Sequence, residues 1–171
     1  SDVTGINGEG TTDYINVLAN DTILSVDAGL MAASRIGDYI WLDENANGEQ
    51  DLSEIGVNGI RVGLFDAFGS IIDSTMSGPH PITSLPGFYE FDQLAPGPYF
   101  VRFDTLSGMA FTNANAGGNE AIDSDVTNAN GLGTTDLFNL LPGQNVDDLD
   151  AGYMDPDALP ATIGDYVWLD R

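Results

Sequence analysis

The feature that most limits the fold is an octapeptide that occurs twice. Residues 36–43 read IGDYIWLD and residues 163–170 read IGDYVWLD. A second match aligns residues 1–30 with residues 124–153 without gaps, with 15 identities in 30 positions. Self-similarity at a spacing of one domain length predicts copies of a single domain. We therefore expect residues 1–30 to be the C-terminal part of one repeat, 31–153 a complete repeat, 154–162 a linker and 163–171 the first strand of a following repeat.

Because the chain begins and ends inside a repeat, two origins are considered for it. A chain that starts and stops inside a repeat is expected to be a window on a longer tandem array. It is alternatively a proteolytic product, since the last residue is Arg171, one of only 4 basic residues.

The complete repeat has the pattern of an all-β domain. Short runs of β-branched and aromatic residues are bounded by Gly, Pro and Asp turns, and no long stretch has a clean 3.6-residue period. Seven or so short strands at this spacing predict a Greek-key-like β-sandwich of the prealbumin or immunoglobulin type. Its core is expected to include Tyr99, Phe91 and Phe103, with Trp41 in the core or in packing between domains. The predicted strands are 37–42, 59–66, 70–75, 87–91, 98–103, 136–141 and 146–151.

Directly after the first predicted strand comes a twelve-residue loop, DENANGEQDLSE at 43–54, that fits the calcium-loop pattern D-x-[DN]-x-[DN]-G-x5-E. Gly48 stands at position 6, where the chain must turn sharply to gather oxygens around one hard cation. No helices flank the loop, so Ca²⁺ is expected to lock strand ends rather than to act as a switch. The alternative is a polar loop that is rich in Asn and Asp by chance. The predicted ligands are the side chains of Asp43, Asn45, Asn47, Asp51 and Glu54 and the main-chain carbonyl of Glu49.

The charge balance excludes several classes of partner. The net charge is −23, from 27 acidic residues against 4 arginines and no lysine. Nucleic acid binding is not expected because phosphate contacts need Lys and Arg, and an anionic membrane surface would repel the chain. No apolar run approaches the ~18 residues of a membrane span. Acidic repulsion opposes compaction unless cations offset it, which again favours bound calcium.

Together these motifs resemble the B-domain of the serine–aspartate repeat surface proteins, a branch of the collagen-adhesin B-type, prealbumin-like sandwiches. The residues that carry the resemblance are GDYIWLD at 37–43, the loop at 43–54, GIRVGL at 59–64, GFYEF at 87–91, LAPGPYFV at 94–101 and DAGY at 150–153. One departure is the longer Pro-rich segment at 75–86. One branch of these relatives is stiffened by Lys–Asn cross-links, which a chain without lysine cannot form; the other uses calcium.

The resemblance implies further calcium ions near the later loops. Acidic residues gather there, and a second site is predicted from Asp123, Asp125, Asp147 and Asp150, with Asp148 and Asp104 as further contributors. Solvated acidic loops are the alternative. His80 between two prolines is expected to be an exposed loop residue, and no catalytic residues are predicted.

The expected function is structural: a calcium-stiffened repeat in an extracellular or cell-surface stalk, fibre or matrix protein. The expected partners are neighbouring repeats or identical subunits, and the strand at 163–169 could complete a sandwich in another subunit and build a filament. The alternative is a cell-surface adhesin domain that binds a host or matrix protein, with the 75–86 segment as the place to look.

Overall fold

The structure is a computed structural model that describes residues 12–20, 22–23, 25–26, 28 and 32–158. The chain divides into two units, Ser1–Ala32 and Ala33–Arg171. The described residues of the first unit include exposed apolar side chains at Tyr14, Val17 and Leu18. Most of the predicted partial repeat at 1–30 and all of the predicted strand at 163–171 lie outside the described residues.

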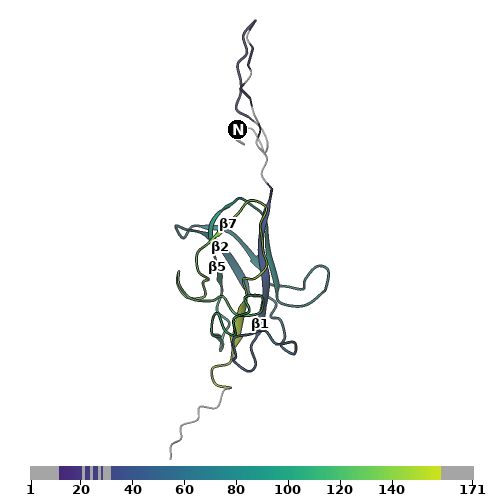
Figure 1. Ribbon diagram of the computed structural model, residues 1–171, viewed down its shortest axis with the longest axis vertical. Helices are drawn as coiled ribbons and strands as arrows, with labels where there is room; N and C mark the ends of the chain where they lie inside the picture. Colours follow the sequence, from purple (N-terminus) through teal and green to yellow (C-terminus); the bar gives the residue numbers. More distant parts are fainter. Residues whose placement is uncertain (1–11, 21, 24, 27, 29–31, 159–171) are drawn as a thin grey trace, which may run out of the picture. The chain divides into compact units, whose positions relative to one another are not determined.

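Within the described ranges, the second unit is a β-sandwich without any helix, and so without a helix that could cross a membrane (Figure 1). The first sheet has the strand order β4-β1-β9-β6, with β8 also paired to β1, and the second has the order β3-β2-β5-β7. The strands are β1 (Ser34–Leu42), β2 (Arg61–Asp66), β3 (Ile71–Met76), β4 (Phe88–Leu94), β5 (Gly97–Phe103), β6 (Ala110–Phe111), β7 (Phe138–Leu140), β8 (Asn145–Val146) and β9 (Ala151–Met154). The all-β sandwich predicted from the sequence is confirmed.

Six of the seven predicted strands correspond to single strands, and the seventh is divided. The run at 146–151 separates into β8 and β9, which both pair with β1 in parallel, β8 at Arg35 and Ile36 and β9 from Ile40 to Leu42. Three acidic residues, Asp147, Asp148 and Asp150, lie between these two contacts, opposite the middle of β1. Strand β6 was not predicted, because two residues carry no periodic signal.

The core lies between the two sheets. Ile60, Val62 and Leu64 are buried and line one face of β2 and its approach, as their alternation predicts. Tyr99, Phe91 and Phe103 are buried core residues, also as predicted. The side chain of Trp41 is fully buried at 0% exposure. Its ring packs beside Gly152 on β9, where an added Cβ would lie 2.8 Å from a ring carbon of Trp41, so the sheet needs a glycine there.

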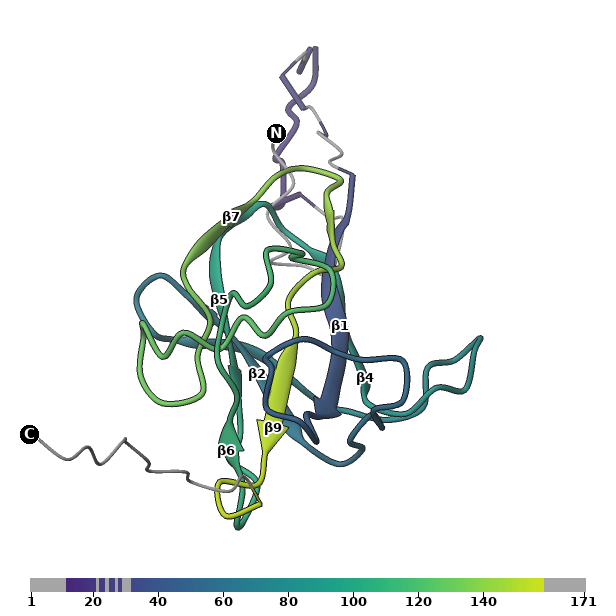
Figure 2. The same ribbon diagram turned by 60° about the horizontal axis from the view of Figure 1, so that its bottom comes forward.

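The parallel pairing of β1 with β9 determines where the candidate site forms. Both strands point the same way and end together, as Figure 2 shows. The N–H of Asp43, the first residue after β1, donates to the carbonyl of Tyr153 on β9 at 2.7 Å. The loop that begins at Asp43 is therefore held at one end of the sandwich by the first and the last strand of the domain.

Candidate metal centre

The predicted calcium loop at 43–54 folds as a turn that is closed by hydrogen bonds between its own side chains. The side-chain amides of Asn45 and Asn47 both donate to the same carboxylate oxygen of Asp51, at 2.7 and 3.1 Å. Loop positions 3, 5 and 9 therefore converge on one point. The side-chain oxygen of Asn45 accepts from the N–H of Asn47, and that of Asn47 accepts from the N–H of Glu49, at 2.9 and 2.7 Å. These two local turns wind the chain around the convergence point.

Asp43 is buried at the base of this loop. One carboxylate oxygen accepts from the N–H of Gly48 at 2.9 Å and from the hydroxyl of Thr112 at 2.5 Å. Gly48 has φ of +85°, and a Cβ there would lie 2.6 Å from the carbonyl oxygen of Asn113. Two properties therefore favour glycine at this position: the positive φ, and the carbonyl of Asn113, which leaves no space for a Cβ. Thr112 was not predicted, because no sequence signal links it to a residue 69 positions earlier.

Glu54 closes the loop. Its two carboxylate oxygens accept one N–H each, from Glu44 and from Asp51, both at 2.9 Å. Burial raises the pKa of Glu54, against the opposing effect of these two hydrogen bonds, and the charges of Asp43 and Asp51 add to the increase. A carboxylate held between the start and the end of a loop is placed as the bidentate ligand of a calcium loop would be.

A second group of carboxylates lies in the segment before β7. One ligand oxygen each from Glu120, Asp123 and Asp125 lies within 4.8 Å of the others, close enough to hold one metal ion. Asp123 has 0% exposure, and neither of its carboxylate oxygens has a hydrogen-bond partner among the described residues. Burial raises the pKa of Asp123, and the charges of Glu120 and Glu49 raise it further. Glu120 was not predicted as a ligand.

Asp150 joins this group from the last loop. Its N–H donates to a carboxylate oxygen of Asp125 at 2.6 Å, and the N–H of Asp125 donates to the carbonyl of Asp150 at 2.9 Å. One side-chain oxygen of Asp150 accepts from the N–H of Tyr39, and the other has no partner among the described residues. Burial raises the pKa of Asp125 to about 7, and burial with the charge of Asp38 raises that of Asp150.

Asp38 on β1, like Glu120, is an acidic residue near the site that was not predicted from the sequence. Burial, together with the charges of Asp147 and Asp148, raises its pKa to about 7. The repeat itself carries a signal for it, because the Gly-Asp-Tyr of 37–39 recurs at 164–166. Asp38 therefore adds another carboxylate to the strand side of the acidic cluster, which we define as Asp38, Glu120, Asp123, Asp125, Asp148 and Asp150.

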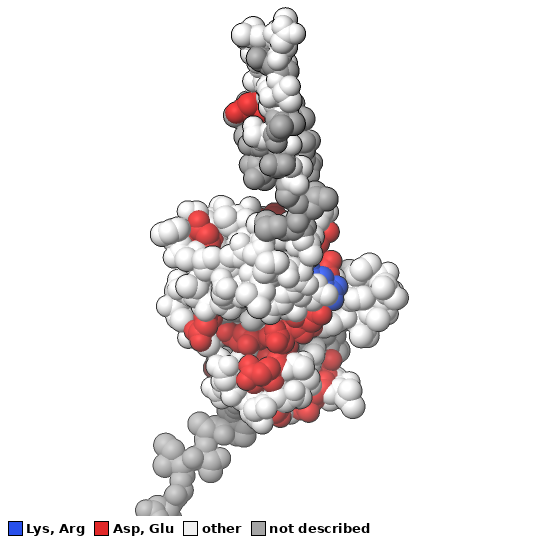
Figure 3. All heavy atoms as spheres, turned by 45° about the horizontal axis from the view of Figure 1, so that its top comes forward, with Lys and Arg blue, Asp and Glu red and all other residues white. Residues whose placement is uncertain are grey.

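The remaining predicted ligands have other neighbours. Asp147 forms an ion pair with Arg35 at 2.9 Å, and Arg35 also contacts Glu90 at 3.1 Å. Asp104 accepts a hydrogen bond from the Tyr153 hydroxyl through its main-chain carbonyl. Figure 3 shows the acidic side chains as a band across one face of the sandwich, with basic atoms at its edge.

The two groups of oxygens are joined by backbone hydrogen bonds. The N–H of Gln50 donates to the carbonyl of Ile122 at 2.6 Å, and that of Ser124 donates to the carbonyl of Gly48 at 3.2 Å. Glu49 and Asp123 face each other in this short antiparallel bridge. The two groups are therefore neighbours that are connected through the main chain.

The donor set of both groups fits a hard divalent cation. Every candidate ligand is an oxygen of a carboxylate, an amide or a carbonyl, and oxygen is the ligand atom that Ca²⁺ prefers. Buried carboxylate oxygens without partners, as in Asp123 and Asp150, are costly unless a cation or a proton compensates them. The acidic cluster could therefore hold a metal ion.

His80 packs against two aromatic rings and accepts hydrogen bonds within the 75–86 segment. Its ring stacks on Tyr39 with centroids 6.2 Å apart and meets the edge of Phe88 at 4.4 Å. Its Nδ1 accepts from the N–H groups of Ile82 and Thr83, both at 3.1 Å, which orders the loop around the ring.

Comparison with known proteins identifies relatives of the chain. The SdrD B-like domain family matches residues 34–153. Serine-aspartate repeat-containing protein F of Staphylococcus epidermidis is 36% identical over 165 residues, covering 96% of this chain and 8% of that protein. Serine-aspartate repeat-containing protein C of Staphylococcus aureus strain N315 is 35% identical over 161 residues, covering 94% of this chain and 15% of that protein.

A shaft pilin, SpaA from Lactobacillus rhamnosus GG, matches with a TM-score of 0.37 and 7% identity, over 72% of this chain and 49% of the pilin, which is too low to carry an argument. The family match covers the whole described sandwich, and the resemblance inferred from the sequence motifs agrees with it. The chain belongs to the SdrD B-like domain family.

Proposed function

We propose that this sandwich is a calcium-stiffened structural repeat of an extracellular, cell-surface protein. The cell-surface location agrees with the family and with the surface proteins that the sequence motifs resemble. The observation that carries the calcium proposal is Asp123, whose carboxylate is fully buried and has no hydrogen-bond partner among the described residues. In a cluster of this charge, a divalent cation stabilises what is otherwise a repulsive core of carboxylates.

The proposal has two calcium positions. The first is held by Asp43, Asn45, Asn47, Asp51 and Glu54, with the carbonyl of Glu49. The second is held by Glu120, Asp123 and Asp125, with Asp150 beside them. Asp147 is not among the proposed ligands, because its carboxylate forms an ion pair with Arg35.

Calcium would stiffen the domain by closing one loop and by joining segments that are distant in the sequence. The first position ties the end of β1 to the far end of the loop that follows it. The second ties the segment before β7 to the last loop, and the bridge between residues 48–50 and 122–124 connects the two. Without cations, the same carboxylates repel one another and favour local opening of these loops. The function is therefore mechanical, and calcium acts as a cross-link rather than as a signal.

In the parent protein, such repeats would follow one another as rigid spacers. The partial repeats at 1–30 and 163–171 would then belong to neighbouring copies, within one chain or between subunits of a filament. Light scattering in calcium and in excess chelator tests the filament. A monomer under both conditions would rule out assembly between subunits and leave the spacer within one chain.

The second candidate function is adhesion, and the ordered 75–86 segment favours it. Packing of His80 on Tyr39 and Phe88 fixes this long loop in one conformation, so that it presents a defined surface. A pull-down of matrix proteins that depends on this loop would support adhesion.

Calcium removal tests the main proposal. We expect excess chelator to lower the Tm and to expose the 113–125 and 147–150 segments to protease. Isothermal titration should return two classes of site, in the range of 10⁻⁴–10⁻³ M or somewhat tighter, as is typical of extracellular modules. A melting curve that does not change in chelator would show that calcium does not stabilise the domain.

A further inference from the structure

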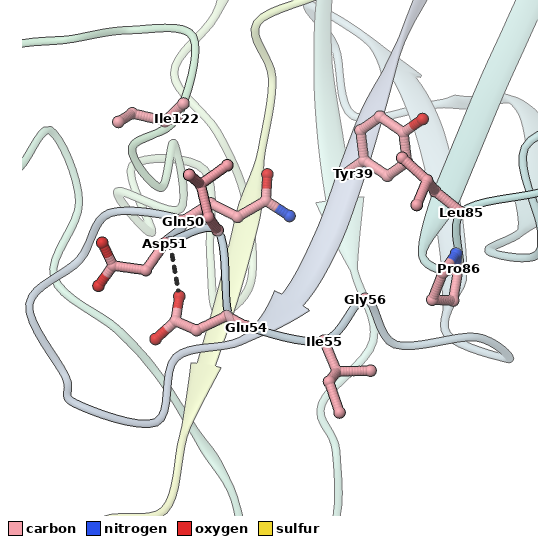
Figure 4. Close-up of a pocket in the computed structure, with 10 residues that line it drawn as sticks. Tyr39, Gln50, Asp51, Glu54, Ile55, Gly56, Leu85, Pro86 and Ile122 are labelled. Carbon is pink, nitrogen blue, oxygen red and sulfur yellow. Dashed lines mark hydrogen bonds between the residues drawn. The ribbon is translucent and has the colours of Figure 1, made fainter. Parts of the chain in front are cut away.

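The pocket beside the calcium loop is a surface cavity, and two of its lining residues, Asp51 and Glu54, are among the proposed calcium ligands. It has a volume of about 410 Å³, within the usual range for binding pockets. The close-up in Figure 4 shows Tyr39, Leu85 and Pro86 on one side and Gln50, Asp51 and Glu54 on the other, with Ile55 and Gly56 below. Most of the lining is apolar, and the two carboxylates stand on one wall.

The walls of this pocket are held in place by the fold. The ring of Tyr39 contacts Phe88, with centroids 5.6 Å apart, and stacks on His80. At the floor, Gly56 approaches Pro86 so closely that an added Cβ would lie 1.9 Å from the Pro86 carbonyl oxygen. The opposite wall is the loop closed by Glu54. A cavity built from such contacts exists before any ligand arrives, which lowers the cost of binding.

The rim of the pocket is unusually apolar for an exposed site. Leu52 is completely exposed, Ile55 is 61% exposed and Leu85 is 55% exposed. These side chains come from two different loops and surround one cavity. An apolar rim around a preformed pocket marks a place where another molecule covers the surface.

The negative charge of the chain indicates which class of partner binds this pocket. Asp51 and Glu54 lie in the wall, and their loop, residues 43–54, carries five carboxylates, so a bound Ca²⁺ leaves the loop negative. The chain as a whole carries a net charge of −23, of which two divalent ions would offset only a small part. An acidic partner, including a second copy of this chain, is repelled from the site. A basic partner is attracted to it and steered towards it.

We propose that this pocket docks a basic protein segment that inserts one aromatic or aliphatic side chain. The inserted side chain contacts Tyr39, Leu85 and Pro86, and the flanking Arg or Lys side chains lie over the carboxylate wall. The apolar anchor supplies most of the affinity, and the charges supply orientation and rate of association.

The experiment uses the full chain, labelled with ¹⁵N, in 1 mM CaCl₂ and 150 mM salt. The probe is a synthetic peptide, Gly-Arg-Gly-Phe-Gly-Arg-Gly, titrated while amide chemical shifts are recorded. We expect saturable shifts at Tyr39, Leu52, Ile55 and Leu85, with a Kd on the order of 10⁻⁴ M, as a single anchor allows. Two control peptides have Ala in place of Phe, or Glu in place of both Arg, and each should bind at least tenfold more weakly.

A matched pair of variants separates docking in the pocket from general attraction to an acidic surface. Leu85→Glu adds a negative charge at the rim, so attraction by charge alone would strengthen peptide binding, whereas docking of the anchor predicts a loss of tenfold or more. Leu132→Glu adds the same charge at an exposed residue that does not line the pocket, and should bind like the parent chain. Binding of the Ala peptide as tight as that of the Phe peptide, or unchanged binding by Leu85→Glu, would overturn the proposal.

Discussion

The main-chain N–H of Asp150 donates to a carboxylate oxygen of Asp125 at 2.6 Å, which holds two acidic residues 25 positions apart side by side. The N–H of Asp125 returns a hydrogen bond to the carbonyl of Asp150 at 2.9 Å. This reciprocal pair fastens the last loop of the sandwich to the segment before β7. It also concentrates negative charge in a buried place, so the stability of the domain depends on what neutralises that charge.

Protons should replace calcium in the metal-stripped protein. Burial raises the pKa of Asp125 and of Asp38 to about 7, above the value of about 3.9 in an unfolded chain. Between these values the folded protein binds more protons, so the free energy of unfolding decreases as pH rises, by up to about 1.4 kcal/mol per proton and pH unit. We expect the Tm of the stripped protein to rise when pH falls from 8 to 6. In saturating calcium this rise should be smaller, and a Tm that falls with pH in the stripped protein would contradict the prediction.

Asp123→Asn should have opposite effects with and without calcium. In the metal-stripped protein, it removes a buried charge that Glu120 and Glu49 repel, so the variant should be more stable than the parent. In calcium the variant should be less stable, because a ligand is lost. Asp73→Asn, on the exposed strand β3, serves as the control and should change neither value. Urea unfolding under both conditions measures the effect, and a loss of stability in both would argue against the second site.

Glu54→Gln should weaken calcium binding at the loop by about tenfold or more, because the amide keeps one acceptor oxygen but loses the bidentate charge. Glu44→Gln changes the charge of the same loop at an exposed residue outside the predicted ligand set, and should leave the affinity nearly unchanged. Isothermal titration distinguishes the two variants. Equal losses would show that net charge, and not ligation by Glu54, controls the site.

Gly48→Ala and Gly59→Ala form a matched pair. Both glycines have φ of +85°, so either substitution costs about 1–2 kcal/mol of backbone strain. A Cβ at Gly48 also meets the carbonyl of Asn113 at 2.6 Å, whereas a Cβ at Gly59 meets nothing within 4 Å. We expect Gly48→Ala to lose a further 1 kcal/mol or more, by the usual cost of overpacking, about 1–3 kcal/mol. Equal free energies of unfolding for the two variants would show that the segment around Asn113 shifts to make room for the Cβ without a cost in stability.

Thr112→Val should destabilise the domain by about 1–3 kcal/mol, because buried Asp43 loses the hydroxyl that donates to it. Thr112→Ser keeps the hydroxyl and should recover most of the loss, apart from the missing methyl group. Urea unfolding of both variants in saturating calcium measures the difference. If Ser is as destabilising as Val, packing rather than the hydrogen bond to Asp43 explains the position of Thr112.

The sequence by itself determined the strand class, most strand positions and the spacing of the oxygen-bearing side chains in the first loop. These properties depend on neighbours along the chain: the alternation of Ile60, Val62 and Leu64 is a property of one strand, and the spacing from Asp43 to Glu54 is a property of one turn. Only the tertiary structure decided which acidic residues meet. Asp38 and Glu120 reach the acidic cluster because β1 pairs in parallel with both β8 and β9, and because residues 48–50 pair with 122–124. Thr112 reaches Asp43 because β6 pairs with β9. Such pairings join segments far apart in the chain, and local sequence carries no signal for which strands become neighbours.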